Sequence, residues 1–311
     1  MRRAGELLYN LRAAPTAAAA RHALSALEDD LTPSQLADLL PELDRLSGLA
    51  RLAWEPSDII RELREADPQP YVRRDLAADA ALFSTPSPAP RDKSLIVALC
   101  GRSYRLMVPW SLFLQFLPAS RFDVVILADR SNNDYFTGVG DYATDLWSLV
   151  KRTLSDVGAS RYRRLYCYGA SVGGLAALRF GVLAGAHRSI SVGGTLTWPI
   201  YRLQSGQSLP AYEPICACSS EHRGHVVCVH ASDARHDRAA AMHVQQILKV
   251  SRIPINGIKR HNIVYMIYRA GGLPVFNAEL FDFDPALVNV RMRRADGSLG
   301  SPAAGAADAP S

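Results

Sequence analysis

The segment from Tyr168 to Gly174 holds a serine in a pattern suited to nucleophilic chemistry. It reads Gly169-Ala170-Ser171-Val172-Gly173-Gly174, with glycines two residues before and two residues after the serine. Glycines at these positions relieve the crowding of a sharp turn, because they carry no Cβ atom. A serine hydroxyl is a weak nucleophile at neutral pH unless a base accepts its proton, and imidazole is the usual base. The pattern therefore predicts that Ser171 is a nucleophile with a histidine partner.

The residues around this motif indicate a strand, a turn and a helix. Arg164–Tyr168 is predicted to be a strand, and Val172–Ala184 is a run of small and apolar residues that predicts a helix. This context places the serine at the carboxyl edge of a sheet, as the motif requires. The alternative is a glycine-rich turn with an incidental serine.

Further apolar runs alternate with amphipathic segments from residue 93 onward. The expected strands are Leu95–Cys100, Phe122–Ala128, Ser189–Val192, His225–His230 and Ile253–Ile258, and the expected helices are Asp141–Ser155, Ala239–Val250 and Asn262–Arg269. Strands alternating with helices at this spacing predict an α/β fold with a doubly wound, mostly parallel sheet covered on both faces.

Residues 1–83 predict a small helical domain that precedes the α/β domain. Ala17–Leu31 has leucines at helical spacing, and Thr32 followed by Pro33 is a typical start for the next helix. Ser57–Glu65 and Tyr71–Phe83 are expected to form two shorter helices. Alternating prolines mark residues 84–92 as a linker. The α/β domain then spans residues 93–285, and the small, polar residues 286–311 predict a disordered tail.

From Lys93 to Asp284 the chain resembles the α/β-hydrolase superfamily. The resemblance rests on Gly169-Ala170-Ser171-Val172-Gly173-Gly174, on the Asp129–Gly138 loop and on His261-Asn262-Ile263. Within that superfamily it is most similar to small serine-hydrolase-like domains found in bacteria beside helical or glycosyltransferase modules. The resemblance implies a catalytic triad in the chain order serine, acid, histidine.

His261 is the expected base among the eight histidines, since it alone follows the last predicted strand and lies downstream of a suitable acid. The acid is expected in the turn after the preceding strand, where two aspartates stand. Asp233 lies where the superfamily's acid usually falls, and we prefer it. Asp237 is the alternative, although it is also suited to stabilising the start of the next helix.

The same resemblance implies an oxyanion hole made of two backbone N–H groups. One is expected from Val172, and the other from Arg102 or Ser103 in the loop after the first strand. Asp129–Phe136 is expected to line the pocket or to be a polar surface loop. Residues 194–224 suggest a short lid with Trp198, Tyr201 and Tyr212. Arg102, Arg105 and Arg130 hint at an acidic acyl or sugar-linked substrate.

The composition of the chain indicates its class of protein and its expected location in the cell. The 311 residues are 48% hydrophobic and 21% charged, with a net charge of +5 from dispersed basic residues. This favours a soluble globular protein and does not suggest a nucleic-acid groove. We expect no membrane-spanning helix and no signal peptide, and the five cysteines are expected to be reduced. A cytoplasmic location follows from these expectations.

The expected function is that of a serine hydrolase of the esterase or acyl-transfer type, which works through a covalent acyl-enzyme and needs no metal or organic cofactor. Its substrate would be a small-molecule or sugar-linked ester, and the helical domain would either buttress the sheet or recruit a protein partner. The alternative is a non-catalytic, hydrolase-like binding or scaffold module in surface-polysaccharide assembly. An intact set of Ser171, Asp233 and His261 counts against that alternative.

Overall fold

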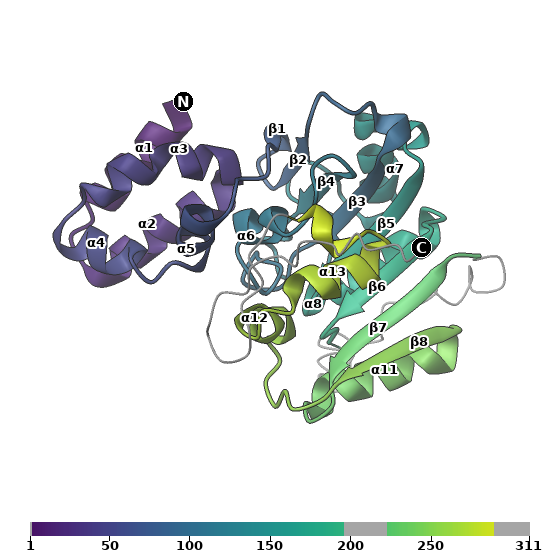
Figure 1. The fold of residues 1–311 in the computed structure, drawn as a ribbon. Helices are drawn as coiled ribbons and strands as arrows, with labels where there is room; N and C mark the ends of the chain where they lie inside the picture. The colour runs from purple at the N-terminus through teal and green to yellow at the C-terminus, as the bar shows by residue number, and fades with distance from the viewer. Residues whose placement is uncertain (1, 196–222, 289–311) are drawn as a thin grey trace, which may run out of the picture.

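One sheet forms the centre of the molecule (Figure 1). The computed structural model describes residues 2–195 and 223–288, and within them eight strands lie in the order β1-β2-β4-β3-β5-β6-β7-β8. Strands β3 to β8 are parallel, and β1 and β2 form an antiparallel hairpin beside β4. The expected α/β fold with a mostly parallel sheet is confirmed. The strands are β1 Val72–Ala77, β2 Ala80–Ser84, β3 Ser94–Leu99, β4 Phe122–Leu127, β5 Arg164–Ala170, β6 Arg188–Val192, β7 His225–Ala231 and β8 Val250–Ile255.

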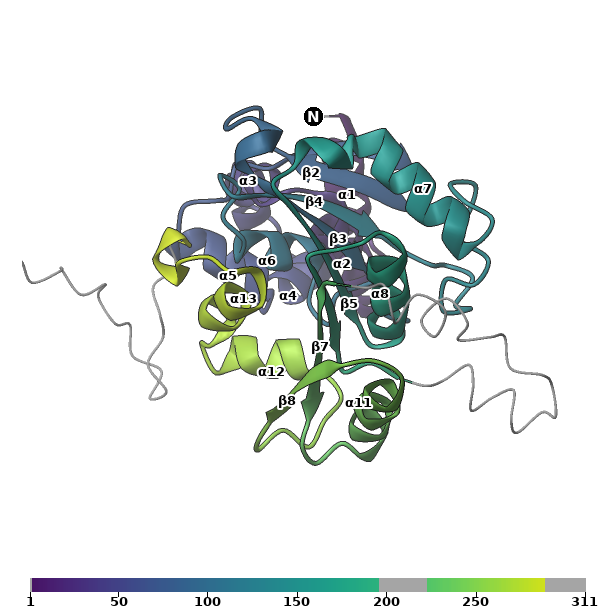
Figure 2. The same ribbon diagram turned by 90° about the vertical axis from the view of Figure 1, so that its right-hand side faces the viewer.

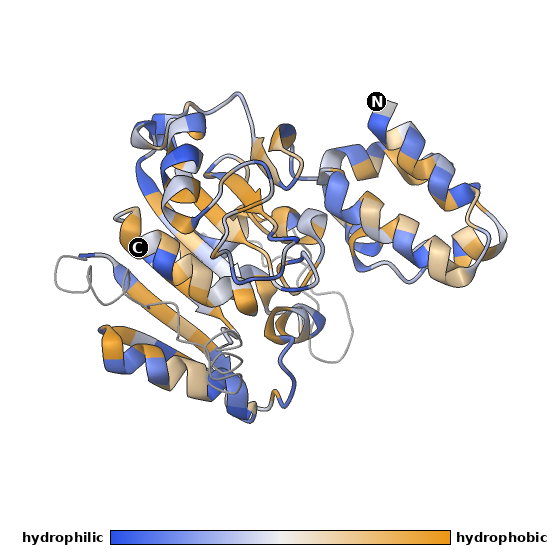
Figure 3. Ribbon diagram, turned by 180° about the vertical axis from the view of Figure 1, so that it is seen from behind, coloured by the Kyte–Doolittle hydropathy of each residue, from blue (hydrophilic) through white to orange (hydrophobic). Residues whose placement is uncertain are grey.

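The central strands are buried on both faces, which explains their continuous apolar sequence. In β3, Ile96 and Ala98 belong to one apolar layer, whereas Leu95 and Val97 belong to the other. Helices α7 (Leu146–Val157), α8 (Val172–Leu183) and α11 (Arg235–Ile247) cover one face, and α6 (Trp110–Gln115), α12 (Ile263–Arg269) and α13 (Leu273–Phe281) cover the other (Figure 2). The strands between these layers are mostly orange in the hydropathy view (Figure 3).

Five helices form a lobe beside the sheet (Figure 1). They are α1 Arg2–Arg12, α2 Ala17–Asp30, α3 Pro33–Asp44, α4 Gly48–Trp54 and α5 Asp58–Glu65. Helix α3 begins as its sequence indicated: Thr32 Oγ1 accepts the N–H of Gln35, whose side chain accepts the N–H of Thr32. Apolar residues of this lobe, such as Leu27, share one core with α6 and the sheet. The lobe is therefore packed onto the α/β domain.

The prediction of a helix at Tyr71–Phe83 was wrong, and so was the domain boundary at residue 83. This segment forms the β1–β2 hairpin and extends the sheet. Its Ala, Leu and Arg residues favour a helix by intrinsic preference. Pairing with the otherwise open edge of β4 buries Leu82 and Phe83, and this tertiary contact outweighs the local preference.

Smaller differences concern the end of the chain. Strand β8 starts at Val250 instead of Ile253, and α11 starts at Arg235 instead of Ala239.

In the described ranges, short 3₁₀ helices lie at Pro90–Asp92, Ala159–Arg161 and Pro285–Leu287. Most of the expected tail and of the expected lid lie outside the described residues. No helix in the described part of the chain is long and apolar enough to cross a membrane.

Candidate active site

Ser171 sits in the turn between β5 and α8 with a strained backbone. Its φ is 57° and its ψ is −124°, a backbone conformation that residues other than glycine rarely adopt. Its N–H donates to the carbonyl of Val192 at 2.9 Å, and its own carbonyl accepts the N–H of Gly174 at 2.9 Å. Strain of this kind costs on the order of 1–3 kcal/mol and persists only where the surrounding structure fixes it. The sheet thus holds the serine at its carboxyl edge.

The two glycines of the motif are required by close backbone approach. A Cβ atom on Gly169 would lie 2.0 Å from the carbonyl oxygen of Gly173, and one on Gly173 would lie 2.2 Å from that of Leu99. Both distances are far below van der Waals contact. Glycine is therefore needed at both positions because β5, β3 and α8 pack closely around the serine.

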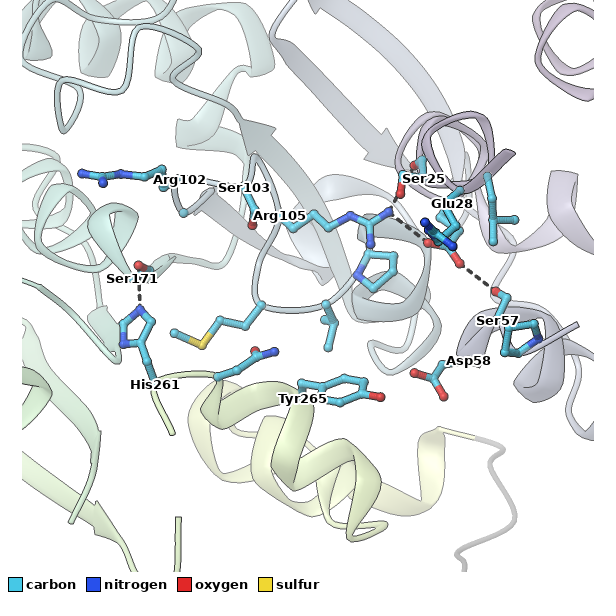
Figure 4. Close-up of a pocket in the computed structure, with 18 of the residues that line it drawn as sticks. Ser25, Glu28, Ser57, Asp58, Arg102, Ser103, Arg105, Ser171, His261 and Tyr265 are labelled. Atoms are coloured by element: carbon cyan, nitrogen blue, oxygen red, sulfur yellow. Dashed lines mark hydrogen bonds and ion pairs between the residues drawn. The ribbon is translucent and has the colours of Figure 1, made fainter. Parts of the chain in front are cut away.

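His261 joins Ser171 to a buried carboxylate. Its Nε2 lies 2.7 Å from Ser171 Oγ, and its Nδ1 lies 2.8 Å from Asp237 Oδ1 (the first contact is drawn in Figure 4). The imidazole is 43% exposed, whereas the Asp237 side chain is only 2% exposed. Asp237 Oδ2 is buried and has no hydrogen-bond partner among the described residues. Within the described residues, His261 is therefore the hydrogen-bond partner of this carboxylate. Asp237 also lies in the first turn of α11, where the helix dipole favours a negative charge.

The acid preferred from the sequence is not the one beside His261. Asp233 is exposed, and no side-chain hydrogen bond ties it to His261 within the described residues. Ser232 turns toward β8, because its N–H donates to Ile255 and its hydroxyl donates to Asn256. Helix α11 then starts at Arg235, and its first turn directs Asp237 to the imidazole. Asp237 therefore both lies at the helix start and contacts the histidine.

The loop of residues 100–109, which joins β3 to α6, passes directly beside the serine. A Cβ atom on Gly101 would lie 3.1 Å from Ser171 Cβ. The N–H of Gly101 donates to the carbonyl of Arg105, and the N–H of Tyr104 donates to the carbonyl of Gly101. Between them, the N–H groups of Arg102 and Ser103 donate no hydrogen bond within the described residues. The structure therefore brings the expected oxyanion-hole residues, Val172 and Arg102 or Ser103, to the same pocket as Ser171.

The strand order, the strained serine after β5, and the chain order Ser171, Asp237, His261 together decide the fold. The chain has an α/β-hydrolase fold.

Comparisons with known proteins agree with this fold and add no argument of their own. No family model and no curated protein matches the sequence. Among solved structures, Est1E from Butyrivibrio proteoclasticus is 13% identical, with 68% of this chain and 99% of that chain covered and a TM-score of 0.45. An alpha/beta hydrolase enzyme from a lagoon-sediment metagenome of Mar Chica, Morocco, is 13% identical, with 68% and 100% covered and a TM-score of 0.45. Esterase 2 of Thermogutta terrifontis is 14% identical, with 69% and 95% covered and a TM-score of 0.45.

A cavity of about 760 Å³ opens at Ser171 of the α/β-hydrolase domain and reaches the helical lobe (Figure 4). This volume falls within the range of sites that hold small-molecule ligands. One end contains Ser171, Val172 and His261, and the other end is lined by residues of α2 and of the segment from α4 to α5. These lobe residues are Arg21, Leu24, Ser25, Glu28, Ala53, Pro56, Ser57 and Asp58.

Two of the three arginines that hinted at an acidic substrate are already neutralised by protein carboxylates. Arg105 is paired with Glu28 and Asp29. Arg130 is paired with Asp79 and stacks on the ring of Tyr104, and it does not line the cavity. Arg102 remains as an exposed side chain at the Ser171 end of the cavity. The inference of an acidic substrate therefore loses most of its support.

The Asp129–Phe136 loop is held against the sheet and α8 by Tyr135 and Asp134, and it does not line this cavity. The Asp129 carboxylate accepts the N–H groups of Ser131, Asn133 and Tyr135. The pocket-lining interpretation therefore does not hold for this cavity, and the loop is not simply a surface loop, since Asp129, Asp134 and Tyr135 are buried. Trp198, Tyr201 and Tyr212 of the suggested lid lie outside the described residues. Among the described residues no cluster of metal-ligating side chains was found, and Cys100, Cys167 and Cys228 are buried thiols.

Sequence reasoning missed the contribution of the helical lobe to this cavity. Glu28, Ser57 and Asp58 carry no recognisable motif, and they are far from Ser171 along the chain. One signal was present: Glu28 follows Leu24 by one helical turn and so interrupts an apolar stripe of α2. A buried charge on such a stripe usually has a partner elsewhere in the fold.

Proposed function

We propose that this protein is a serine hydrolase of the esterase or acyl-transfer type. The observation that carries the proposal is the continuous hydrogen-bonded chain from Ser171 Oγ through His261 to Asp237. A serine, an imidazole and a carboxylate in this order are the parts of a catalytic triad, and its role is acyl transfer.

In the proposed reaction, Ser171 Oγ bonds to the carbonyl carbon of an ester while its proton passes to His261 Nε2. Asp237 holds the Nδ1 proton of the imidazole and stabilises the cation that forms. The N–H groups of Val172 and of Arg102 or Ser103 would stabilise the oxyanion. When the resulting tetrahedral intermediate collapses, the ester C–O bond breaks and the leaving alkoxide takes the proton from His261. A water molecule or an acceptor hydroxyl then attacks the acyl-enzyme by the same route in reverse.

A serine-directed fluorophosphonate tests the proposal. We expect the protein to gain one phosphonyl adduct at Ser171, detected by intact-mass and peptide mass spectrometry, and to hydrolyse p-nitrophenyl butyrate. Ser171→Ala should lose both reactions, whereas Ser25→Ala, a serine of the same cavity, should keep them. Undiminished labelling of Ser171→Ala would refute the proposed nucleophile.

A further inference from the structure

The helical lobe is tied to the loop of residues 100–109 by one ion-pair cluster (Figure 4). Arg105 Nε donates to Asp29 Oδ2 at 2.8 Å, and Arg105 Nη2 donates to Glu28 Oε2 at 2.9 Å and to the carbonyl of Ser25 at 3.2 Å. One guanidinium from the loop thus contacts three acceptors that lie within about one turn of α2. The planar fork of arginine suits this arrangement, and a lysine could not reproduce it.

Both carboxylates are held by further contacts, so neither is free to move away. Glu28 Oε1 accepts the hydroxyl of Ser57 at 2.7 Å, just before α5. Asp29 Oδ1 accepts the N–H of Trp110 at 3.2 Å, at the start of α6. The cluster therefore fixes Arg105 against three elements at once: α2, the α5 start and the α6 start.

Arg105 in turn closes the turn that presents Arg102 and Ser103. Its carbonyl accepts the N–H of Gly101 at 2.8 Å. Tyr104 and Met107, on either side of it, have φ angles of 62° and 63°, which are unfavourable for residues other than glycine. Such a loop keeps its shape only where outside contacts hold it. In the described residues, Trp110 Nε1 donates to the carbonyl of Tyr104 and Arg130 stacks on the Tyr104 ring. The ion pairs of Arg105 are what joins this part of the loop to the carboxylates of α2.

We propose that Glu28 and Asp29 of the helical lobe act through Arg105 as positioning residues for the oxyanion-hole loop. This inference rests on the proposed function. The lobe would then be a working part of the active site, since it holds the donors of Arg102 or Ser103 where the oxyanion develops. A displacement of these N–H groups lowers the stabilisation of the transition state more than it lowers substrate binding.

Arg105→Lys tests the proposal, with Arg73→Lys as its matched control. Arg73 also joins α2 to the α/β domain, through the carboxylate and carbonyl of Asp30, and it does not line the cavity. On p-nitrophenyl butyrate we expect Arg105→Lys to lower kcat roughly 10- to 100-fold with KM changed less than about threefold, because one oxyanion donor is worth about 10²–10³ in kcat. Affinity for phenylboronic acid, whose adduct on Ser171 places an oxygen in the oxyanion hole, should fall in parallel. Arg73→Lys should lower Tm by about as much as Arg105→Lys does, but it should leave kcat within about twofold of wild type.

Glu28→Gln is a milder second variant, since it keeps an acceptor for Ser57 and leaves Asp29 on Arg105. It should lower kcat in the same direction by a smaller factor. Equal losses of kcat in Arg105→Lys and Arg73→Lys, or a Tm loss in Arg105→Lys without a kcat loss, would overturn the proposal.

Amide hydrogen exchange separates failure of this proposal from failure of the proposed function. In Arg105→Lys the N–H groups of Gly101 and Tyr104 should exchange faster than in Arg73→Lys, whether or not the protein cleaves an ester. Unchanged protection at these two positions would contradict the positioning role. A wild-type protein that resists fluorophosphonate, with the expected loop exchange, would instead refute only the serine-hydrolase function.

Discussion

Asp237 holds His261 through an Oδ1–Nδ1 contact of 2.8 Å, and it does so from the first turn of α11. The free N–H groups at a helix start favour a negative charge, so the position that stabilises the helix also stabilises the ionised carboxylate. This matters because the carboxylate is buried and only one of its oxygens is hydrogen-bonded within the described residues.

Asp237→Asn should lower kcat on p-nitrophenyl butyrate by a factor on the order of 10⁴, because the amide no longer holds the imidazole in the required tautomer. Asp233→Asn is the matched control in the same turn and should keep kcat within about twofold, since Asp233 is exposed. Steady-state kinetics of both purified variants, with circular dichroism to verify folding, measures the difference. A large loss in Asp233→Asn with normal turnover in Asp237→Asn would return the acid role to Asp233.

Gly173→Ala should destabilise the fold strongly, because the new Cβ would lie 2.2 Å from the carbonyl oxygen of Leu99. We expect a loss of at least about 1–3 kcal/mol in the free energy of unfolding, typical of overpacked cores. Gly5→Ala, with nothing within 4 Å of the new Cβ, is the control and should be neutral or slightly stabilising in helix α1. Urea unfolding compares the two; equal midpoints would show that β3 and α8 separate more easily than the packing implies.

Asp29 should make stability depend on pH below neutrality. Burial raises the pKa of its carboxyl from 3.8 to about 6, although the neighbouring Arg105 acts in the opposite direction. Between these two pKa values the native protein binds the proton and the unfolded chain does not, so the contribution of Asp29 to stability is fully present below about pH 4 and is lost as the pH rises through about 6. Asp29→Asn should remove this dependence, of about 1–3 kcal/mol, in urea titrations across that range. Asp30→Asn, from the same helix, should retain it, and an unchanged slope in Asp29→Asn would contradict the prediction.

Ala53→Trp should narrow the cavity at the end formed by the helical lobe, because Ala53 lines it there. We expect turnover of p-nitrophenyl decanoate to fall at least about tenfold and that of p-nitrophenyl acetate to change less than about twofold, since the short ester does not reach the lobe. Leu52→Trp, at the neighbouring position with a 69% exposed side chain, is the control. Parallel loss of both esters in Ala53→Trp, or no loss of either, would show that the ester chain does not extend toward the lobe.

The local sequence determined the parts of this protein whose physics is local. The glycines on either side of Ser171 indicate a close backbone approach, and the apolar runs indicate strands that are buried on both faces. Thr32 followed by Pro33 predicts a helix start. Each of these patterns depends on residues within one turn or one strand. The sequence could therefore predict the parallel strands and the serine turn, and the chain order of the superfamily that it resembles pointed to His261.

Tertiary structure alone decided what depends on the relative placement of distant segments. The edge of β4 converted a helix-prone segment into the β1–β2 hairpin, since the free energy gained by pairing and burial exceeds the small differences in intrinsic preference. The choice between Asp233 and Asp237 depended on where α11 begins, which Ser232 and β8 set together. The partners of Arg105 lie some 75 to 80 residues away on α2. The other lobe residues of the cavity come from α2 and from the segment from α4 to α5, also far from Ser171 along the chain. No local pattern carries that information, because an ion pair between distant segments exists only once the chain has folded.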